Sequence, residues 1–405
     1  MTFSQLYENL LKKELLGKDF DIRNIDKKGL NCLLEPENYA AVIKTDTCKA
    51  DECDGSCKAA CIFNAIDIEN GNIVIKKDLC CGCAACIKAC KDKKIVPSKE
   101  IVAAIKAVHK NKLSYALVAP AFMGQFDKNV TPGMLRNALK KLGFTGMVEV
   151  SLFADILTLK EALELNKNIK SDTDFMLTSC CCPVWISMIK RNYDKIGSHL
   201  YGSVSPMIAC GRLIKKIHPS ATTVFIGPCL AKKSEAKEKD LLGVIDYCVT
   251  LKELADAFNI ANIDPRLCKD SEKDHSSKMG RIYAVSGGVS EAVITTAKRL
   301  STKDRKIKAI TAEGVKNLKD LIDDILNGNI KANFYEGMGC DGGCVGGPKA
   351  IIKKEDGKKN AADYAAAANY ETPIDNPFCI ELLERIGVKT VEDLLDNELL
   401  KRDFI

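Results

Sequence analysis

The stretch TSCCCPVW, residues 178–185, organises the rest of the sequence, together with two later stretches, GPCLAKKSE (227–235) and EGMGCDGGCVGGP (336–348). They carry three consecutive cysteines, then one, then a pair with three residues between its members. This is too many thiols for a packed core, and a reducing cytosol gives them no disulfide role. Soft thiolates select iron–sulfur clusters, zinc or copper(I). We therefore predict that one cysteine from the first stretch, one from the second and two from the third hold a single four-iron cluster.

Glycines around the third stretch favour a metal site over a packed core. The alternative is that cysteines simply serve as small apolar residues, which is our interpretation of Cys32, Cys248, Cys268 and Cys379. A backbone without side chains can approach a bulky inorganic group and point its N–H groups at sulfide. The glycines concerned are Gly337, Gly339, Gly342, Gly343, Gly346 and Gly347.

Taken in order, the three stretches resemble the three signature motifs of the [FeFe]-hydrogenase catalytic domain. Three independent motifs in order are far more specific than any one of them. Shorter stretches are similar to the same family: ALKKLGF (138–144), KEALEL (160–165) and VSGGVSEA (285–292). The resemblance implies an enzyme that interconverts protons plus electrons with H2, and two α/β lobes that clasp the active site.

The resemblance also implies the cofactor, called the H-cluster. It is a [4Fe–4S] cluster joined through one cysteine to a diiron unit with CO, cyanide and a bridging dithiolate. Cys344 matches the bridging position, and Cys182, Cys229 and Cys340 match the other cluster ligands. Side chains cannot themselves stabilise a hydride, so the difficult step belongs to a cofactor that the protein binds and shields. Separate maturation proteins would supply the diiron unit.

Further residues match positions around the diiron unit in the resembled family. Lys232 keeps the spacing of a lysine that meets a cyanide ligand, where an ammonium offsets the charge. A solvated lysine is the alternative, because three more lysines follow closely. Met338 matches a methionine that packs over the diiron unit, with core filling as its alternative. The turn Ala119, Pro120 and Ala121, after an expected buried strand, matches residues that line the pocket.

Three consecutive cysteines leave two ways to assign roles in the first stretch. Counting back from Pro183 makes Cys182 the cluster ligand and Cys181 the thiol that passes protons to the cofactor. Counting forward from Thr178 shifts both roles by one residue, and Cys180 has no role in the first count. We favour the downstream count because a helix that begins near Pro183 would fix the geometry. A free thiol, with a pKa of about 8.5, suits a proton relay.

Two glutamates upstream match the proton-conducting glutamates of the resembled family. Glu161 and Glu164 are three residues apart, so they lie on one face of the expected helix. Exposed glutamates are common on helices, which is the alternative interpretation. By simple spacing, the serine expected between them falls on Tyr201, with Ser203 nearby.

Three positions depart from the family's pattern. Ala121 has no hydroxyl where the family often has serine, Met207 stands where a glutamine is usual, and Gly227 replaces a methionine. We therefore expect a divergent, monomeric branch of the family. The alternatives are an H2 sensor with slow turnover, an iron–sulfur protein that lacks the diiron unit, and a plain electron carrier. Lys232 argues against an iron–sulfur protein that lacks the diiron unit. The large catalytic region argues against a plain electron carrier.

Nine cysteines lie between Cys48 and Cys90, with spacing typical of a two-cluster bacterial ferredoxin. The stretch AIDIENGNIVI (65–75), with Asn-Gly at its centre, predicts a hairpin between the two half-motifs. The fourth cysteine of each run serves the other cluster. We therefore predict two further [4Fe–4S] clusters, and zinc sites are the rival interpretation. Cys81 is left without a role or competes with Cys80. The predicted ligands are Cys48, Cys53, Cys57 and Cys90 for one cluster, and Cys61, Cys80, Cys83 and Cys86 for the other.

The order of apolar and helical segments predicts an α/β main body with smaller regions before it. We expect an N-terminal helical segment at 1–40, a small α+β ferredoxin-like domain at 41–97 and the H-cluster domain at 98–405. Ser98 is the expected N-cap of the first helix of the large domain. Apolar runs between helical ones predict mostly parallel sheets flanked by helices, and the runs are GMVEV, FMLTS, TTVFIG, YCVT and RIYAVS.

Composition and charge limit the cellular compartments and the classes of binding partner that we expect for this protein. Lys and Arg outnumber Asp and Glu by 60 to 54, a net charge of +6. So mild a charge, with no basic stripe interleaved with aromatics, argues against nucleic-acid binding. No apolar run approaches the ~18 residues that cross a bilayer, so we expect no membrane association, and no secretory signal layout is visible. We expect a cytoplasmic protein whose cysteines hold metal, with ferredoxin or a similar carrier as its electron partner.

Overall fold

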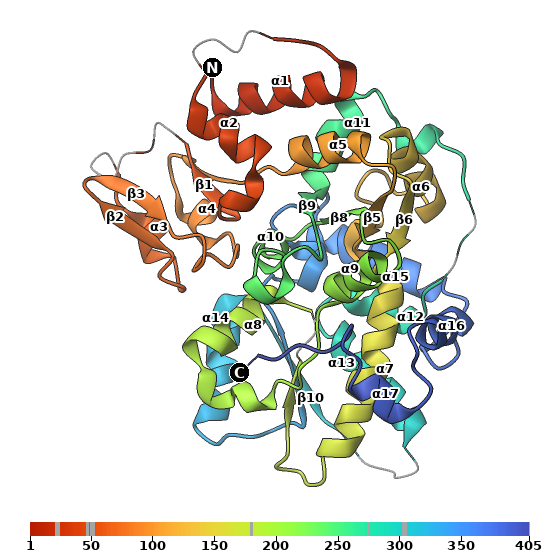
Figure 1. Cartoon of the computed structure of the whole chain (residues 1–405). Helices are drawn as coiled ribbons and strands as arrows, with labels where there is room; N and C mark the ends of the chain where they lie inside the picture. The colour runs from red at the N-terminus through yellow and green to blue at the C-terminus, as the bar shows by residue number, and fades with distance from the viewer. Residues whose placement is uncertain are drawn as a thin grey trace.

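The computed structural model describes residues 1–20, 25–45, 48, 53–178, 181–271, 273, 275–301 and 306–404. Figure 1 shows two helices at the N-terminal end, a small lobe beside them, and a larger body built around two parallel sheets. The mixed α/β architecture with parallel sheets and covering helices confirms the predicted fold class.

The first two helices pack on the main body, where both contact α5 (Ile101–Lys110). α1 (Phe3–Leu16) begins with a capping box at Thr2 and ends at Gly17 in a left-handed conformation, so both ends have ordinary helix signals. Its inner side buries Leu6, Leu10 and Leu11, and the Tyr7 hydroxyl donates to Asp256 Oδ2 at 2.8 Å. α2 (Lys27–Leu34) follows.

The described residues from β1 (Val42–Lys44) to β4 (Ile95–Pro97) include two short sheets, and we call this part of the chain the small lobe. The predicted hairpin is confirmed: β2 (Ile66–Glu69) pairs antiparallel with β3 (Asn72–Ile75). Asn70 and Gly71 both have positive φ, as a tight turn between twisted strands requires. The second sheet pairs β1 with β4. Two short helices, α3 (Ser56–Ala59) and α4 (Ala85–Ala89), complete this lobe.

The first sheet of the main body has the order β6-β5-β8-β9, and all its pairings are parallel. Leu117 and Phe225 join a core on one face, while Ala116 and Val224 join a core on the other. Both faces are covered, which explains why its strands are buried at most positions. Its strands are β5 (Ser114–Val118), β6 (Gly146–Glu149), β8 (Thr222–Gly227) and β9 (Tyr247–Thr250). The helices that follow or flank them include α5 (Ile101–Lys110), α6 (Pro132–Lys141), α9 (Pro206–Ile217), α10 (Ala231–Glu235) and α11 (Leu251–Ile260).

The second sheet has the order β10-β11-β7 and is also parallel. Its strands are β7 (Met176–Leu177), β10 (Ala309–Glu313) and β11 (Phe334–Met338). Helices around it and between the two sheets are α7 (Ser151–Asn168), α8 (Pro183–Asn192), α12 (Lys278–Arg281), α13 (Gly288–Leu300) and α14 (Val315–Leu326). The chain closes with α15 (Lys354–Ala366), α16 (Pro377–Arg385) and α17 (Val391–Leu395).

Two local predictions are wrong. RIYAVS is helical, with α12 ending at Arg281 and a 3-10 turn over Ile282–Ala284. This run is largely buried, so its apolar pattern carries no period that separates helix from strand. Ser98 does not cap α5. Its N–H and hydroxyl both donate to the Ala41 carbonyl, and the first amides of α5 donate to Glu253 instead.

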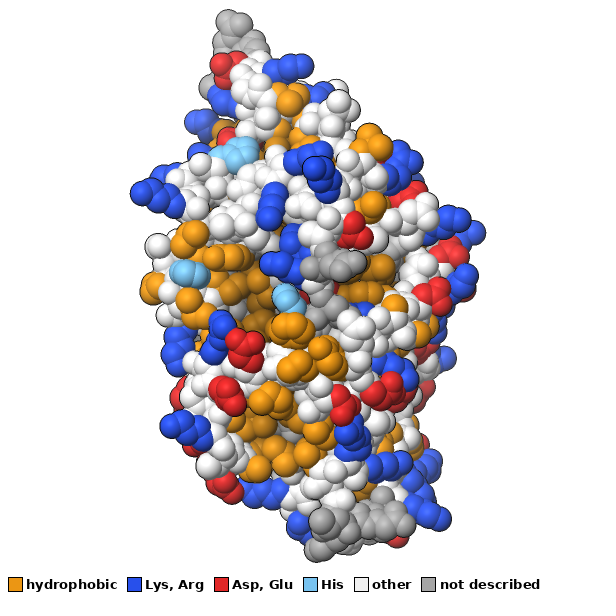
Figure 2. Space-filling view, turned by 90° about the vertical axis from the view of Figure 1, so that its right-hand side faces the viewer, with side chains coloured by type: hydrophobic (Ala, Val, Ile, Leu, Met, Phe, Trp, Pro, Cys, Tyr) orange, Lys and Arg blue, Asp and Glu red, His pale blue; other side chains and the backbone are white. Residues whose placement is uncertain are grey.

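No helix in the described ranges is both long and apolar enough to span a membrane. Figure 2 shows the face that lies on the right in Figure 1, where basic and acidic side chains are interspersed and apolar side chains gather toward the middle.

Candidate metal centre

Each of the three cysteine stretches follows the carboxyl end of a parallel strand. β8 ends at Gly227, just before Cys229, and β11 ends at Met338, just before Cys340. β7 ends at Leu177, ahead of the first stretch. Such strand ends form the crevice in which open α/β sheets bind ligands. Here the ends of two different sheets face one cavity.

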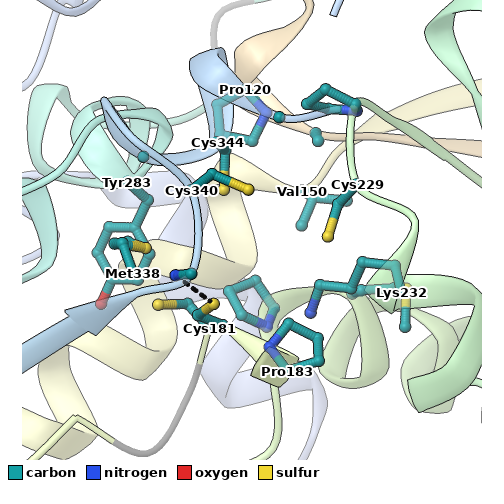
Figure 3. Close-up of a pocket in the computed structure, with 18 of the residues that line it drawn as sticks. Pro120, Val150, Cys181, Pro183, Cys229, Lys232, Tyr283, Met338, Cys340 and Cys344 are labelled. Carbon is teal, nitrogen blue, oxygen red and sulfur yellow. Dashed lines mark hydrogen bonds between the residues drawn. The ribbon is translucent and has the colours of Figure 1, made fainter. Parts of the chain in front are cut away.

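That cavity collects residues of all three stretches. In Figure 3 the side chains of Cys181, Cys229, Cys340 and Cys344 converge on a shared space, and Lys232 reaches into it from another side. Among the described lining residues, Lys232 carries the one charged side chain, and the remaining wall is largely apolar. The predicted site residues that line the cavity are Ala119, Pro120, Cys181, Cys182, Cys229, Lys232, Met338, Cys340 and Cys344.

The first and third stretches are held together by contacts that only glycine allows. A β-carbon on Gly337 would lie 2.2 Å from Cδ2 of the buried Trp185, and one on Gly339 would lie 2.7 Å from Cβ of Val184. The Trp185 indole donates to the Thr178 carbonyl at 3.0 Å, so both ends of the first stretch are tied together. The Gly339 N–H donates to Cys182 Sγ at 3.2 Å. A backbone N–H group thus points at sulfur.

The second and third stretches meet in the same way. A β-carbon on Gly347 would lie 2.9 Å from the Pro228 carbonyl oxygen, which also accepts from the Lys349 N–H at 3.0 Å. Gly343 has φ +80° and would place a β-carbon 2.5 Å from the Ser286 nitrogen. These glycines therefore have a packing role that the sequence did not reveal: Gly347 lets the second and third stretches touch, and Gly343 lets the third stretch touch the turn at Ser286.

The thiols are buried deeply enough to oppose ionisation. Burial raises the pKa of Cys182 to about 12, with the nearby Cys181 and Cys229 thiols acting in the same direction. Burial also raises the pKa of Cys229, Cys340 and Cys344. Thiolates here need cationic charge beside them, which a metal supplies as it displaces the protons. A soft, all-sulfur donor set in an apolar wall fits an iron–sulfur cluster.

Lys232 keeps its charge inside this cavity. Burial alone would lower its pKa, but the Glu235 carboxylate offsets burial and holds the pKa above its usual value. Lys232 Nζ donates to Glu235 Oε2 at 2.6 Å. An ammonium in a largely apolar cavity is a strong donor to an anionic ligand. Glu235 was not predicted, although it lies three residues from Lys232 on the same short helix.

Glu161 and Glu164 lie on α7 and are buried, outside the lining of this cavity. Lys160 Nζ donates to Glu164 Oε1 at 2.5 Å and to Ser203 Oγ at 3.1 Å. Ser203 also lines a smaller hollow beside Cys181. Burial raises the pKa of Glu164 to about 7, although Lys160 acts to lower it. A broken chain of polar groups therefore leads from α7 toward the cavity, and it passes through Ser203.

One other predicted residue lies elsewhere. Ala121 does not line the cavity. It is buried in a small cluster that includes Ala284 and Val345 and packs against Cys344. Cys180 lies outside the described residues.

The cysteines of the small lobe gather in two groups. Cys48, Cys53, Cys57 and Cys90 line one hollow. The other group contains Cys61, Cys80, Cys83 and Cys86. Burial is the main cause that raises the pKa of Cys86 to about 12, and the other three thiols raise it further. The Cys81 thiol donates to Cys83 and lowers its pKa to about 7. In the described part of the chain, no three Cys, His, Asp or Glu residues lie close enough to hold a single metal ion.

The second group lies beside the cavity that the three stretches line. Gly82 has φ +78°, and a β-carbon there would lie 2.8 Å from Ala231 Cα and 2.8 Å from the Leu230 carbonyl oxygen. Ala231 is two residues from Cys229, a predicted cluster ligand. Cys83 also contributes to the raised pKa of Cys340. The loop that carries Cys80 and Cys83 therefore touches the backbone beside the cavity.

Comparison with known proteins agrees with this geometry. Residues 112–348 match the family described as "Iron only hydrogenase large subunit, C-terminal domain". Iron hydrogenase 1 of Clostridium pasteurianum is 29% identical over 273 residues, which are 57% of this chain and 47% of that protein. The periplasmic [Fe] hydrogenase large subunit of Nitratidesulfovibrio vulgaris is 30% identical over 268 residues, 55% of this chain and 64% of that protein. The chain thus spans less than two thirds of either relative's length.

Similarity extends to solved structures and to proteins with other names. The structure of a variant of the [FeFe]-hydrogenase HydA1 from Chlamydomonas reinhardtii aligns with a TM-score of 0.61 and 21% identity, covering 75% of this chain and 98% of that one. This likeness shows a shared fold. Cytosolic iron-sulfur assembly component 3 of Bos taurus is 22% identical over 382 residues, 77% of this chain and 80% of that protein.

Proposed function

This chain belongs to the iron-only hydrogenase large-subunit family, and from that premise we propose that it interconverts H2 with two protons and two electrons. One observation carries the proposal: cysteines from three distant stretches line one cavity together with a buried, charged lysine. Membership alone would not separate a hydrogenase from relatives that share its fold, since function resides in the site.

We assign the four-iron cluster of the H-cluster to Cys182, Cys229, Cys340 and Cys344. Their donor set suits it, and the Gly339 N–H already donates to one of these sulfurs. When bound, the diiron unit would supply the open metal position and the hydride-stabilising metal that side chains cannot provide. Lys232 would then hold an anionic ligand of that unit, while apolar residues exclude water.

Protons would pass between Cys181 and α7. Cys181 lines both the cavity and the smaller hollow that Ser203 shares. Ser203 and Glu164 both contact Lys160, and a Glu164 pKa of about 7 suits proton exchange at neutral pH. Glu161, which is also buried on α7, is the second carboxylate that we assign to this route.

Electrons would arrive through the small lobe. Two groups of four cysteines suit two [4Fe–4S] clusters, and such clusters reach the low potentials that the proton couple requires. The contact of Gly82 with Ala231 brings the loop of the nearer group beside the cavity. Ferredoxin or a similar carrier, acting in the cytoplasm, is the donor we propose, and separate maturation proteins would deliver the diiron unit.

Infrared spectroscopy after cofactor loading tests the proposal. Protein reconstituted with iron and sulfide and then matured with the diiron cofactor should show bands of iron-bound CO and cyanide. A Cys344→Ser variant should lack them, whereas Cys268→Ser, at a buried cysteine outside the cavity, should retain them. H2 release from a strong reductant should accompany the bands. The proposal fails if iron analysis accounts only for the small lobe and no H2 forms.

The same experiment decides the second candidate, an iron–sulfur protein without the diiron unit. Its support is the similarity to an iron-sulfur assembly component over most of both chains. For that function, a full iron content with no CO or cyanide bands is expected. CO and cyanide bands with very slow H2 turnover would instead favour the H2 sensor.

A further inference from the structure

Two of the lysines that follow Cys229, Lys233 and Lys237, have side chains that are largely buried. By sequence, Lys233 and Lys237 belong to a basic run with Lys232 and Lys239 that is typical of a solvated surface. In the structure the Lys233 side chain is 0% exposed and that of Lys237 is 12% exposed. A buried ammonium is costly unless it is paired and hydrogen-bonded, so the partners of these two residues reveal their role.

Lys233 joins the cavity backbone to the start of the large domain. Its Nζ donates to the Ser98 carbonyl at 3.0 Å and to Glu253 Oε2 at 3.0 Å. Glu253 Oε1 in turn accepts from the Glu100 N–H at 2.6 Å and the Ile101 N–H at 3.3 Å. Ser98 itself donates to Ala41, directly before β1 of the small lobe. An unbroken chain of bonds therefore runs from α10, which carries Lys232, to the small lobe.

Lys237 makes a parallel connection. Its Nζ donates to the carbonyls of Pro36 and Tyr39 at 2.8 and 3.2 Å and to Glu100 Oε1 at 2.9 Å. Glu100 Oε2 also accepts from the Cys248 N–H at 2.7 Å, on strand β9. Pro36 and Tyr39 lie just before β1 of the small lobe. The two lysines thus bond the segment after Cys229 to residues that come just before and just after the small, cysteine-rich lobe in the sequence.

We propose that Lys233 and Lys237 are positioning residues that lock the cysteine-rich lobe onto the cavity, and so fix the separation between the nearer cluster and the cavity cluster. The contact that their hydrogen bonds would hold in place is that of Gly82 with Ala231. This inference rests on the proposed function only for the identity of the clusters. The lock itself is a property of the polypeptide.

If Lys233 and Lys237 only stabilised the fold, removing another buried ion pair should have the same effect. A pair elsewhere in the chain therefore serves as a matched control. Arg136 and Glu149 form another buried pair, at 3.2 Å with 7% exposure of each side chain. The described hydrogen bonds of Arg136 go to Glu149 and Ser271, neither of which lies in the small lobe. Arg136→Met should therefore destabilise the large body without loosening the small lobe.

The test compares Lys233→Met, Lys237→Met and Arg136→Met in protein that carries iron–sulfur clusters and no diiron unit. Hydrogen exchange is measured on peptides that cover residues 79–86 and 95–101. We expect exchange to accelerate roughly tenfold or more in both lysine variants, the response to losing a hydrogen bond to a charged group. Arg136→Met should leave these peptides unchanged.

Electron paramagnetic resonance of the fully reduced protein supplies a second readout. Magnetic coupling between the nearer cluster and the cavity cluster should weaken in the lysine variants and persist in Arg136→Met. If Lys233→Met does not fold, Lys237→Met, whose side chain is partly exposed, carries the test. Equal effects in all three variants, or unchanged exchange in the lysine variants, overturn the lock. Absence of H2 activity in wild-type protein would overturn the proposed function and leave the lock standing.

Discussion

Gly82 and Ala231 touch so closely that a β-carbon on residue 82 would lie 2.8 Å from the Ala231 Cα. Residues far apart in the sequence thus bring the cysteine-rich lobe against the backbone beside Cys229. The contact is backbone to backbone, so neither side can yield by moving a flexible side chain.

Gly82→Ala should disrupt this contact. A left-handed conformation costs a non-glycine residue about 1–2 kcal/mol, and overpacking adds about 1–3 kcal/mol. Gly243→Ala is the matched control, because Gly243 has φ +80° and no atom near its would-be β-carbon. Thermal unfolding and iron content should therefore suffer more in Gly82→Ala than in Gly243→Ala. Equal losses would mean that the lobes do not meet as tightly as the structure shows.

Lys160→Met should move the pH dependence of H2 turnover upward. The Glu164 pKa is about 7 with Lys160 beside it, and Lys160 lowers that value by favouring the carboxylate. Removing the ammonium therefore raises the pKa, and Glu164 ionises only at higher pH. Glu164→Gln should reduce turnover about 10²-fold or more if this carboxylate relays protons. An unchanged pH profile in Lys160→Met would exclude Glu164 from the route.

Glu253→Gln should remove an acid-sensitive part of the stability. Burial alone would raise the Glu253 pKa, but Lys233, Lys99 and hydrogen bonds lower it to about 2, below its ordinary value. A lowered folded-state pKa stabilises the fold above the unfolded-state pKa, and this contribution disappears as pH falls toward 2. Urea unfolding of the apoprotein should show a loss of about 3–5 kcal/mol in the variant at pH 7. The difference in unfolding free energy between wild type and Glu253→Gln should decrease below about pH 4. A difference that stays constant with pH would contradict the lowered pKa of Glu253.

Arg402→Ala should expose the side of the cavity that holds Cys181. Arg402 is 6% exposed and pairs with Glu238 at 2.7 Å and Asp240 at 2.8 Å. It lines the small hollow beside Cys181 together with Phe404. Alkylation of Cys181 in the apoprotein, followed by mass spectrometry, should become several-fold faster. Arg299→Ala, which breaks the more exposed pair with Asp375, is the control and should not change that rate.

The strands and motifs were predictable because they depend on local pattern. TTVFIG is a strand from its first to its last residue, and Asn70-Gly71 turns the predicted hairpin. RIYAVS could not be assigned correctly, since near-uniform burial removes the periodicity that separates helix from strand. The burial of Lys233 could not be predicted either, because its hydrogen-bond partners Ser98 and Glu253 are distant in the sequence.

The sequence by itself determined the chemistry of this protein: thiol-bearing stretches at the ends of apolar strands, and a lysine at fixed spacing after Cys229. Side-chain type and spacing are local properties, so they can be read without coordinates. Only the tertiary structure decided which thiols share a cavity, that Glu164 pairs with Lys160, and that the cysteine-rich lobe lies against Ala231. Those relationships arise from the packing of distant segments, and burial by such segments sets both the pKa values and the partners of the charged groups.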